Sequence, residues 1–202
     1  MISAENALRR LRDGNARYVA GEAGPAPSAH EARRKELPEM QSPSAIILGC
    51  SDSRVPPEIV FGQDVGDLFV VRVAGNIAAR SQIGSIEFAA QTFGVRLIVV
   101  LGHSRCGAIE AVVAELRKPS VLQSDNLDFV IDKLRPSVEQ VMTNGYGHDP
   151  DMLIAAVGRE NVRRSMEALQ HDSKIIGELV EHEDLVIVGA EYSLQTGVVE
   201  FF

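Results

Sequence analysis

Two short runs of consecutive apolar residues constrain the fold of this chain more than any other feature. They span residues 45–49 and 97–101, and residues 68–73 and 185–190 have a similar character. Strands that lack a polar–apolar alternation are typical of a parallel sheet that is covered on both faces. Because these runs alternate with segments that have a helical pattern, the sequence predicts an α/β fold.

The predicted elements also give the sheet a topology. We expect a mostly parallel sheet of four strands in the order 2-1-3-4, with helices on both faces. A turn at residues 195–197 should lead into a short antiparallel edge strand at the C-terminus, residues 198–202. The predicted helices span residues 3–20, 56–61, 81–92, 106–116, 124–143, 150–169 and 172–181.

A length of 202 residues fits one domain, which we expect to span residues 1–202. Residues 1–40 should form an N-terminal helix and an irregular arm, because residues 21–28 are rich in Gly, Pro and Ala. We expect this N-terminal part to pack on a partner subunit, although packing on its own domain fits the sequence equally well.

The charge and the cysteine content limit the classes of partner and the compartment. A net charge of −8 argues against nucleic acid or an anionic membrane surface as partner. No stretch approaches the roughly 18 uncharged apolar residues that a membrane span needs, and residues 1–18 lack the apolar centre of a secretory signal. Two cysteines in a chain that shows no export signal indicate a reducing compartment, where thiols serve as ligands or nucleophiles more often than as a disulfide. We therefore expect a cytoplasmic protein.

The only two cysteines of the chain stand beside the ends of predicted strands. Cys50 directly follows the first strand, His103 follows the third, and Cys106 comes three residues later. In open α/β sheets, ligands bind beyond the carboxyl ends of strands where the strand order reverses, and a 2-1-3 order would bring these residues together. Two thiols and an imidazole are ligands that Zn²⁺ prefers, and three protein ligands leave the open position of a catalytic site. The sequence therefore predicts a zinc enzyme.

Other interpretations of these cysteines are weaker. A free cysteine is often a small buried core residue, and that interpretation fits either cysteine taken alone. A cysteine phosphatase needs five residues between its cysteine and its arginine, whereas only three separate Cys50 from Arg54. A redox pair of Cys50 and Cys106 would leave His103, Asp52 and Arg54 without a role. The joint pattern favours the metal site.

Beyond these residues, the chain resembles the β-class carbonic anhydrases over nearly its whole length. The Cys-x-Asp-x-Arg and His-x-x-Cys motifs, in this order and separation, are specific to that family. The similar segments are residues 50–56, 66–72, 74–76, 84–89, 102–107, 159–162 and 188–192.

The resemblance implies a function and roles for the residues of the two motifs. Cys50, His103 and Cys106 would hold Zn²⁺, and a zinc-bound hydroxide would hydrate carbon dioxide reversibly to bicarbonate and a proton. Asp52 and Arg54, which lie two residues apart and so project to the same side of an extended loop, would form the dyad that orients this hydroxide. We also hypothesise that Asp52, once released by Arg54, becomes a fourth zinc ligand in a closed state.

Motif matching further implies a mostly apolar substrate pocket. Its expected residues are Gln41, Phe69, Ala74, Phe88 and Gly107, the last through its backbone N–H. The sequence departs from the family pattern in two places, because Phe88 replaces a tyrosine of many plant relatives and residues 72–76 vary the usual motif. A bicarbonate-inhibited subgroup carries tryptophan where this chain has Ile47, so we predict no inhibitory bicarbonate site of that kind.

The resemblance also implies a homodimer or a dimer of dimers, since relatives build the site at a dimer interface. Two alternative functions stay open: hydrolysis of carbon disulfide or carbonyl sulfide on the same scaffold, and a noncatalytic structural homologue. The sequence does not select a proton acceptor. The histidines outside the motifs are His30, His148, His171 and His182.

Overall fold

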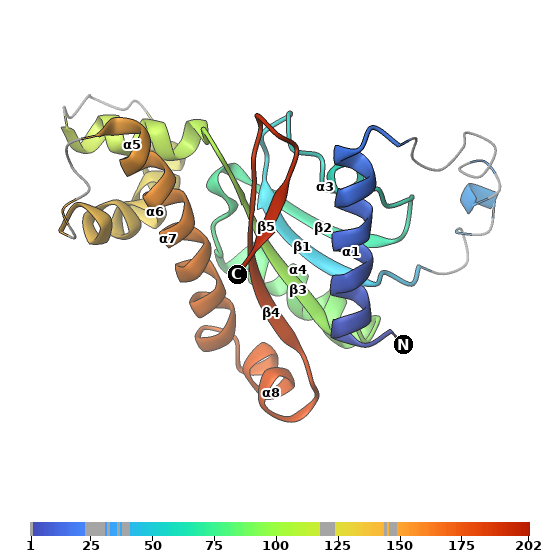
Figure 1. Ribbon diagram of the computed structural model, residues 1–202. Coiled ribbons are helices and arrows are strands. Elements are labelled where there is room, and N and C mark those ends of the chain that lie inside the picture. The colour runs from blue at the N-terminus through green and yellow to red at the C-terminus, as the bar shows by residue number, and fades with distance from the viewer. Residues whose placement is uncertain are drawn as a thin grey trace.

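A five-stranded sheet forms the centre of the computed structural model (Figure 1). The structure describes residues 2–22, 31, 33–35, 37, 41–117, 124–143, 145 and 149–202. Most of the predicted arm, together with His30 and His148, lies outside the described residues. The strands are β1 (Ala45–Cys50), β2 (Leu68–Val73), β3 (Leu97–His103), β4 (Val186–Tyr192) and β5 (Val199–Phe201).

The strand order β2-β1-β3-β4-β5 confirms the predicted topology. The pairs β1–β2, β1–β3 and β3–β4 are parallel, and β5 runs antiparallel to β4. The helices are α1 (Ala4–Val19), α3 (Pro57–Val60), α4 (Arg80–Thr92), α5 (Gly107–Arg117), α6 (Asp125–Thr143), α7 (Pro150–His171) and α8 (Lys174–His182), with a 3-10 turn, η1, at Ala74–Asn76.

Helices cover both faces of the sheet, as the apolar runs predicted. Ala45 and Ile47 of β1 pack in a core beneath α1 and α3, whereas Ile46 and Leu48 pack in a second core with α4, α7 and α8. Successive side chains of a strand point to opposite faces, which is why a run without polar residues is needed here. Figure 1 shows α1 and α7 on opposite sides of the sheet.

A third apolar cluster lies beyond the carboxyl ends of β1 and β3. It joins Cys50 and Cys106 to buried residues of α5, α6 and α7, among them Leu134 and Leu153. This cluster surrounds the edge of the sheet where the two sequence motifs end. The fold therefore encloses the cysteines in a packed, largely apolar environment.

Two strands extend further than the apolar runs predicted. β3 continues through Gly102 and His103, because these residues pair with Glu191 and Tyr192 of β4. β1 likewise includes Cys50, which pairs with Val73. The expected metal ligands Cys50 and His103 are therefore the last residues of hydrogen-bonded strands rather than the first residues of loops. The ladder holds their backbone in place.

The N-terminal helix is anchored on the rest of the chain by a buried polar residue. Ser3 caps the first turn of α1, its side chain accepting a hydrogen bond from the Asn6 N–H. The Asn15 amide donates to the carbonyls of Val60 (3.0 Å) and Gly197 (2.9 Å) and accepts from the Val199 N–H at 2.9 Å. In the described part of the chain, no helix has the length and apolarity to cross a membrane.

Candidate metal centre

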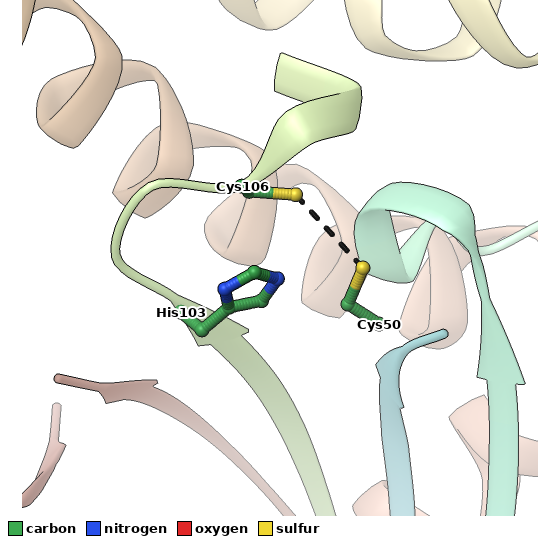
Figure 2. Close-up of side chains that lie close together, drawn as sticks. All are labelled: Cys50, His103 and Cys106. Carbon is green, nitrogen blue, oxygen red and sulfur yellow. Dashed lines mark hydrogen bonds between the residues drawn. The ribbon is translucent and has the colours of Figure 1, made fainter. Parts of the chain in front are cut away.

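Cys50, His103 and Cys106 converge on one point at the sheet edge (Figure 2). All three are buried, and one ligand atom of each lies within 4.8 Å of the other two. The two sulfur atoms are 3.9 Å apart. Figure 2 shows both sulfurs and the imidazole ring directed toward a shared space. The residues come from the ends of β1 and β3 and from the position just before α5, as the motif spacing predicted.

The turn between β3 and α5 brings Cys106 back over the sheet. Arg105 has φ +52°, a left-handed conformation that is uncommon for a residue other than glycine. Two hydrogen bonds hold this turn: the Ser104 N–H donates to the Tyr192 carbonyl at 2.9 Å, and the Leu194 N–H donates to Ser104 Oγ at 2.9 Å. The strained residue is thus fixed between the strand and the helix that begins at Gly107.

The imidazole of His103 presents one nitrogen for a metal. Its Nδ1 lies 3.0 Å from the Ser104 carbonyl, which accepts a hydrogen bond from the Nδ1–H tautomer. That tautomer leaves a lone pair on Nε2, and Nε2 is buried without a hydrogen-bond partner among the described residues. The Asp52 carboxylate is 3.9 Å away, too far for a hydrogen bond. A buried nitrogen without a partner, facing two sulfurs, fits a metal ligand.

The two thiols lie within hydrogen-bond distance, and this contact shifts their pKa values in opposite directions. The hydrogen bond with Cys106 lowers the pKa of Cys50 far below that of an ordinary thiol. The same hydrogen bond, followed by burial, raises the pKa of Cys106. A divalent cation would supply the positive charge that both sulfurs need in order to ionise together. With a neutral imidazole as third donor, the set fits Zn²⁺.

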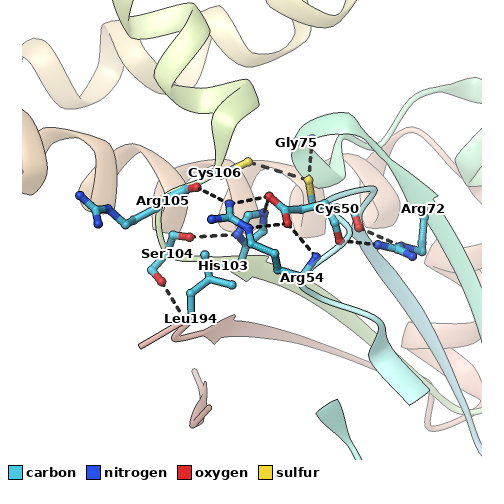
Figure 3. A network of polar contacts seen from close by, with 10 residues as sticks. Cys50, Arg54, Arg72, Gly75, His103, Ser104, Arg105, Cys106 and Leu194 are labelled. Carbon is cyan, nitrogen blue, oxygen red and sulfur yellow. Dashed lines mark hydrogen bonds and ion pairs between the residues drawn. The ribbon is translucent and has the colours of Figure 1, made fainter. Parts of the chain in front are cut away.

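Asp52 and Arg54 form a bidentate ion pair, and Figure 3 shows Arg54 beside the ligands His103 and Cys50. Arg54 Nε donates to Asp52 Oδ1 at 2.9 Å, and Nη2 donates to Oδ2 at 2.7 Å. The Arg54 backbone N–H also donates to Oδ1, at 3.0 Å. These hydrogen bonds hold the pKa of Asp52 well below its usual range. The carboxylate is therefore ionised and fixed in orientation next to His103.

A second arginine, which the sequence did not single out, braces the same loop. Arg72 at the end of β2 donates from Nε to the Cys50 carbonyl at 3.0 Å and from Nη2 to the Asp52 carbonyl at 2.6 Å. Its position in the segment 66–72, which resembles the family, was the available signal. Arg54 Nη2 also donates to the Arg105 carbonyl at 3.2 Å, so the two motif loops are joined directly.

The five residues predicted for the substrate pocket are spread over several elements, and two of them, Ala74 and Gly107, are chain neighbours of Gly75 and Cys106 at the metal centre. Phe69 of β2 and Phe88 of α4 are ring neighbours, 6.4 Å apart, and 53% of Phe88 is exposed. Gln41 and Ala74 are exposed residues that precede β1 and follow β2, and Gly107 begins α5. Their role in binding substrate stays a prediction.

A cavity of about 640 Å³ opens beside the metal ligands. His103, Cys106 and Arg54 line it, together with residues of α5, α7 and the β4–β5 turn. The carboxylates of Glu110 and Asp151 also face it, whereas the five predicted pocket residues are not among those that line it. His171 and His182, by contrast, are exposed at the C-terminal ends of α7 and α8.

Comparisons with known proteins agree with the fold and place the chain in a family. Residues 45–199 match the family model described as "Carbonic anhydrase". The chain is 37% identical over 194 residues to a carbonic anhydrase of Mycolicibacterium smegmatis, covering 96% of this chain and 91% of that protein. It is similar to the crystal structure of the β-carbonic anhydrase CafA of Aspergillus fumigatus, with a TM-score of 0.77, 26% identity and coverage of 87% and 82%. A structure of tetrameric β-carbonic anhydrases from Sordaria macrospora matches in fold, with a TM-score of 0.76, 23% identity and coverage of 87% and 90%.

Proposed function

This chain belongs to the β-class carbonic anhydrases, and from that premise we propose that it hydrates carbon dioxide reversibly to bicarbonate and a proton, using Zn²⁺ held by Cys50, His103 and Cys106. The observation that carries the proposal is the convergence of two sulfurs and a ring nitrogen of His103 within 4.8 Å, together with a buried His103 Nε2 that has no hydrogen-bond partner among the described residues. Cobalt and iron accept the same donor types, so the choice of zinc rests on the preference of zinc for mixed thiolate and imidazole sets.

Zinc bound by these three side chains would lower the pKa of a water molecule in its open position and so supply a nucleophile near neutral pH. The chain's own contribution is orientation. Asp52 is ionised, and hydrogen bonds from Arg54 hold both of its oxygens. It would accept the proton of the attacking oxygen in a hydrogen bond and thereby direct a lone pair of that oxygen at the carbon of the substrate.

The Asp52–Arg54 pair also supports the hypothesis of a closed state. Asp52 Oδ2 lies 3.9 Å from His103 Nε2. If the hydrogen bonds from Arg54 were broken, rotation of the Asp52 side chain would bring its carboxylate to the metal as a fourth ligand. Metal-edge absorption across the pH range of activity tests this. A spectrum with two sulfurs, one nitrogen and one water oxygen that stays unchanged over that range would exclude the closed state.

We propose a homodimer or a dimer of dimers, formed at the side of the sheet where β2 lies. β2 has a strand partner on one side only among the described residues, and most of its side chains are half-buried whereas those of β1 are fully buried. The exposed Phe88 and its neighbours Phe69 and Phe93 form an aromatic patch there. The tetrameric Sordaria enzymes support such an assembly. The predicted pocket residues on this side would then reach the metal site of the partner subunit.

Stopped-flow hydration of carbon dioxide tests the proposed function, with carbonyl sulfide and carbon disulfide hydrolysis measured beside it. We expect the zinc-loaded protein to accelerate carbon dioxide hydration, and Asp52→Ala to lower kcat/KM by about 10²–10³-fold, the usual cost of losing one orienting group in a preorganised site. Faster turnover of the sulfur compounds would favour the alternative hydrolase. A zinc-loaded protein no faster than buffer on any of the three would favour a noncatalytic homologue.

The reaction and the two thiols also fit a location in the cytoplasm, which we propose for this protein. Both cysteines are free and buried, and ligand thiols are kept reduced in that compartment.

A further inference from the structure

A three-residue turn after β2 places a backbone N–H on one of the metal-binding sulfurs. In η1, the Gly75 N–H donates to Cys50 Sγ, with 3.4 Å between nitrogen and sulfur. Figure 3 shows this contact on the side of Cys50 that faces away from Arg54. Cys50 and Gly75 are both buried, so water does not compete for the sulfur. Hydrogen bonds of this kind favour the charged form of a thiol.

Gly75 itself is held in a conformation that few residues adopt. Its φ of +69° is left-handed, and a Cβ at this position would come within 2.9 Å of Leu134. The glycine is therefore required both for its backbone angle and for its lack of a side chain. The Gly75 carbonyl faces α7, and a buried carbonyl needs a donor.

Asn161 of α7 supplies that donor. Its Nδ2 donates to the Gly75 carbonyl at 2.7 Å, and 2% of the residue is exposed. One helical turn later, Ser165 Oγ donates to the next carbonyl, that of Asn76, at 3.2 Å. Residues four apart lie on the same helix face, so α7 presents two polar side chains to two consecutive carbonyls of η1. Of these two side chains, Asn161 bonds the residue whose N–H reaches the sulfur, and Ser165 bonds the next residue.

We propose that Asn161 is a positioning residue of the metal centre, which aims the Gly75 N–H at Cys50 Sγ by holding the carbonyl of the same glycine. Asn161 donates to the carbonyl of Gly75, and the N–H of the same glycine donates to Cys50 Sγ. Without the hydrogen bond from Asn161, Gly75 would be free to rotate its N–H away from the sulfur. The N–H withdraws electron density from the sulfur and stabilises it as a thiolate ligand. This inference rests on the proposed function in taking Cys50 as a zinc ligand.

Zinc affinity, measured by competition with a chelator, provides the first test. Asn161→Leu keeps the approximate size of the side chain and removes the donor. We expect it to bind zinc about 10- to 100-fold more weakly than the wild type, the range typical for partners of metal ligands. Ser165→Ala is the matched control, because it removes the neighbouring donor to η1 and leaves the Gly75 carbonyl bonded. We expect its zinc affinity to equal that of the wild type.

Spectroscopy separates this role from a general effect on folding. In the cobalt-substituted protein, the sulfur-to-cobalt charge-transfer band should move to lower energy in Asn161→Leu, since the sulfur regains electron density, and stay in place in Ser165→Ala. In the ¹¹³Cd-substituted wild type, the Gly75 amide proton should show scalar coupling to cadmium through the sulfur, and Asn161→Leu should lose it. If Asn161→Leu does not fold, Asn161→Ser, whose hydroxyl is too short to span the contact, serves for the same comparison.

The possible outcomes distinguish this inference from the proposed function. If the sulfur-to-cobalt charge-transfer band and the zinc affinity are the same in the wild type and the Asn161 variants, the positioning role alone is overturned. Equal losses in Asn161→Leu and Ser165→Ala would do so as well, because they would indicate a purely structural contribution of the α7–η1 contact. A wild type that binds neither zinc nor cobalt would instead overturn the proposed function.

Discussion

At the scale of single residues, the ionisation of Asp52 depends on Arg54, and this dependence has a direction in pH. The pKa of Asp52 in the folded chain lies below its unfolded value because Arg54 holds both oxygens. The pair therefore stabilises the fold fully above the unfolded pKa of about 4. This contribution is lost as the pH falls below that value toward the folded pKa.

Arg54→Gln should consequently lose more stability relative to the wild type near pH 6 than near pH 3.5. Urea denaturation at both values, with the metal content matched, measures the two differences. Arg135→Gln is a suitable control, since Arg135 makes a single, exposed contact with Asp132 at 3.3 Å, and such pairs contribute little. If the stability difference between Arg54→Gln and the wild type grows as the pH falls, Arg54 does not stabilise the ionised form of Asp52.

The ligand residues could be predicted from the sequence, whereas the residues that brace them could not. Cys50, His103 and Cys106 stand at the ends of recognisable apolar strands, and parallel strands bring their carboxyl ends to one edge. Arg72 and Asn161 act through backbone carbonyls. Arg72, Gly75 and Asn161 all lie in segments that resemble the family, but the sequence does not show which backbone carbonyl each side chain bonds or that Gly75 is left-handed.

At the scale of elements, α1 is attached to the sheet by Asn15, and the strength of this attachment can be measured. Asn15→Ala would leave two carbonyls and the Val199 N–H without their partners in a buried position. We expect the free energy of unfolding to fall by about 1–3 kcal/mol.

The exposed Asn6 on the same helix gives the control for this prediction. Asn6→Ala removes only a side-chain contact with Arg9 and should change stability by no more than about 0.5 kcal/mol. Equal effects of the two substitutions would show that Asn15 does not anchor the helix.

The elements themselves were predicted well, and their ends less well. Runs of apolar residues identified the parallel strands, but hydrogen bonds to a neighbouring strand decide where a strand stops. β3 continues to His103 because β4 continues to Tyr192 beside it. η1 was not predicted, because a turn of three residues has no period from which to recognise it.

At the scale of the whole molecule, the aromatic patch of Phe69, Phe88 and Phe93 should form the contact between subunits. Phe88→Glu places a charge at its exposed centre and should shift the protein to a single chain in light scattering, with a loss of activity. Phe129→Glu is the control, because Phe129 is equally exposed (52% against 53%) but lies on α6. A Phe88→Glu protein with the mass of the wild-type oligomer would contradict this assembly.

The proposed assembly would also explain why the predicted pocket residues do not come together within one chain. The predicted residues Gln41, Phe69 and Phe88 do not line the cavity beside the metal ligands, and a sequence does not indicate which side chains a second subunit contributes. The single domain predicted for residues 1–202 likewise stays a prediction, since part of residues 1–40 lies outside the described residues.

The most direct test of the central claim is a zinc titration of the metal-stripped protein, followed by carbon dioxide hydration in stopped flow. The account predicts that activity is absent without metal, rises in proportion to added zinc, and stops rising when each chain holds a single ion. Cys106→Ser, with one sulfur ligand replaced, should bind zinc more weakly and gain little activity over the same range. Full activity in the stripped protein, or zinc-saturated protein that hydrates carbon dioxide no faster than buffer, would contradict it.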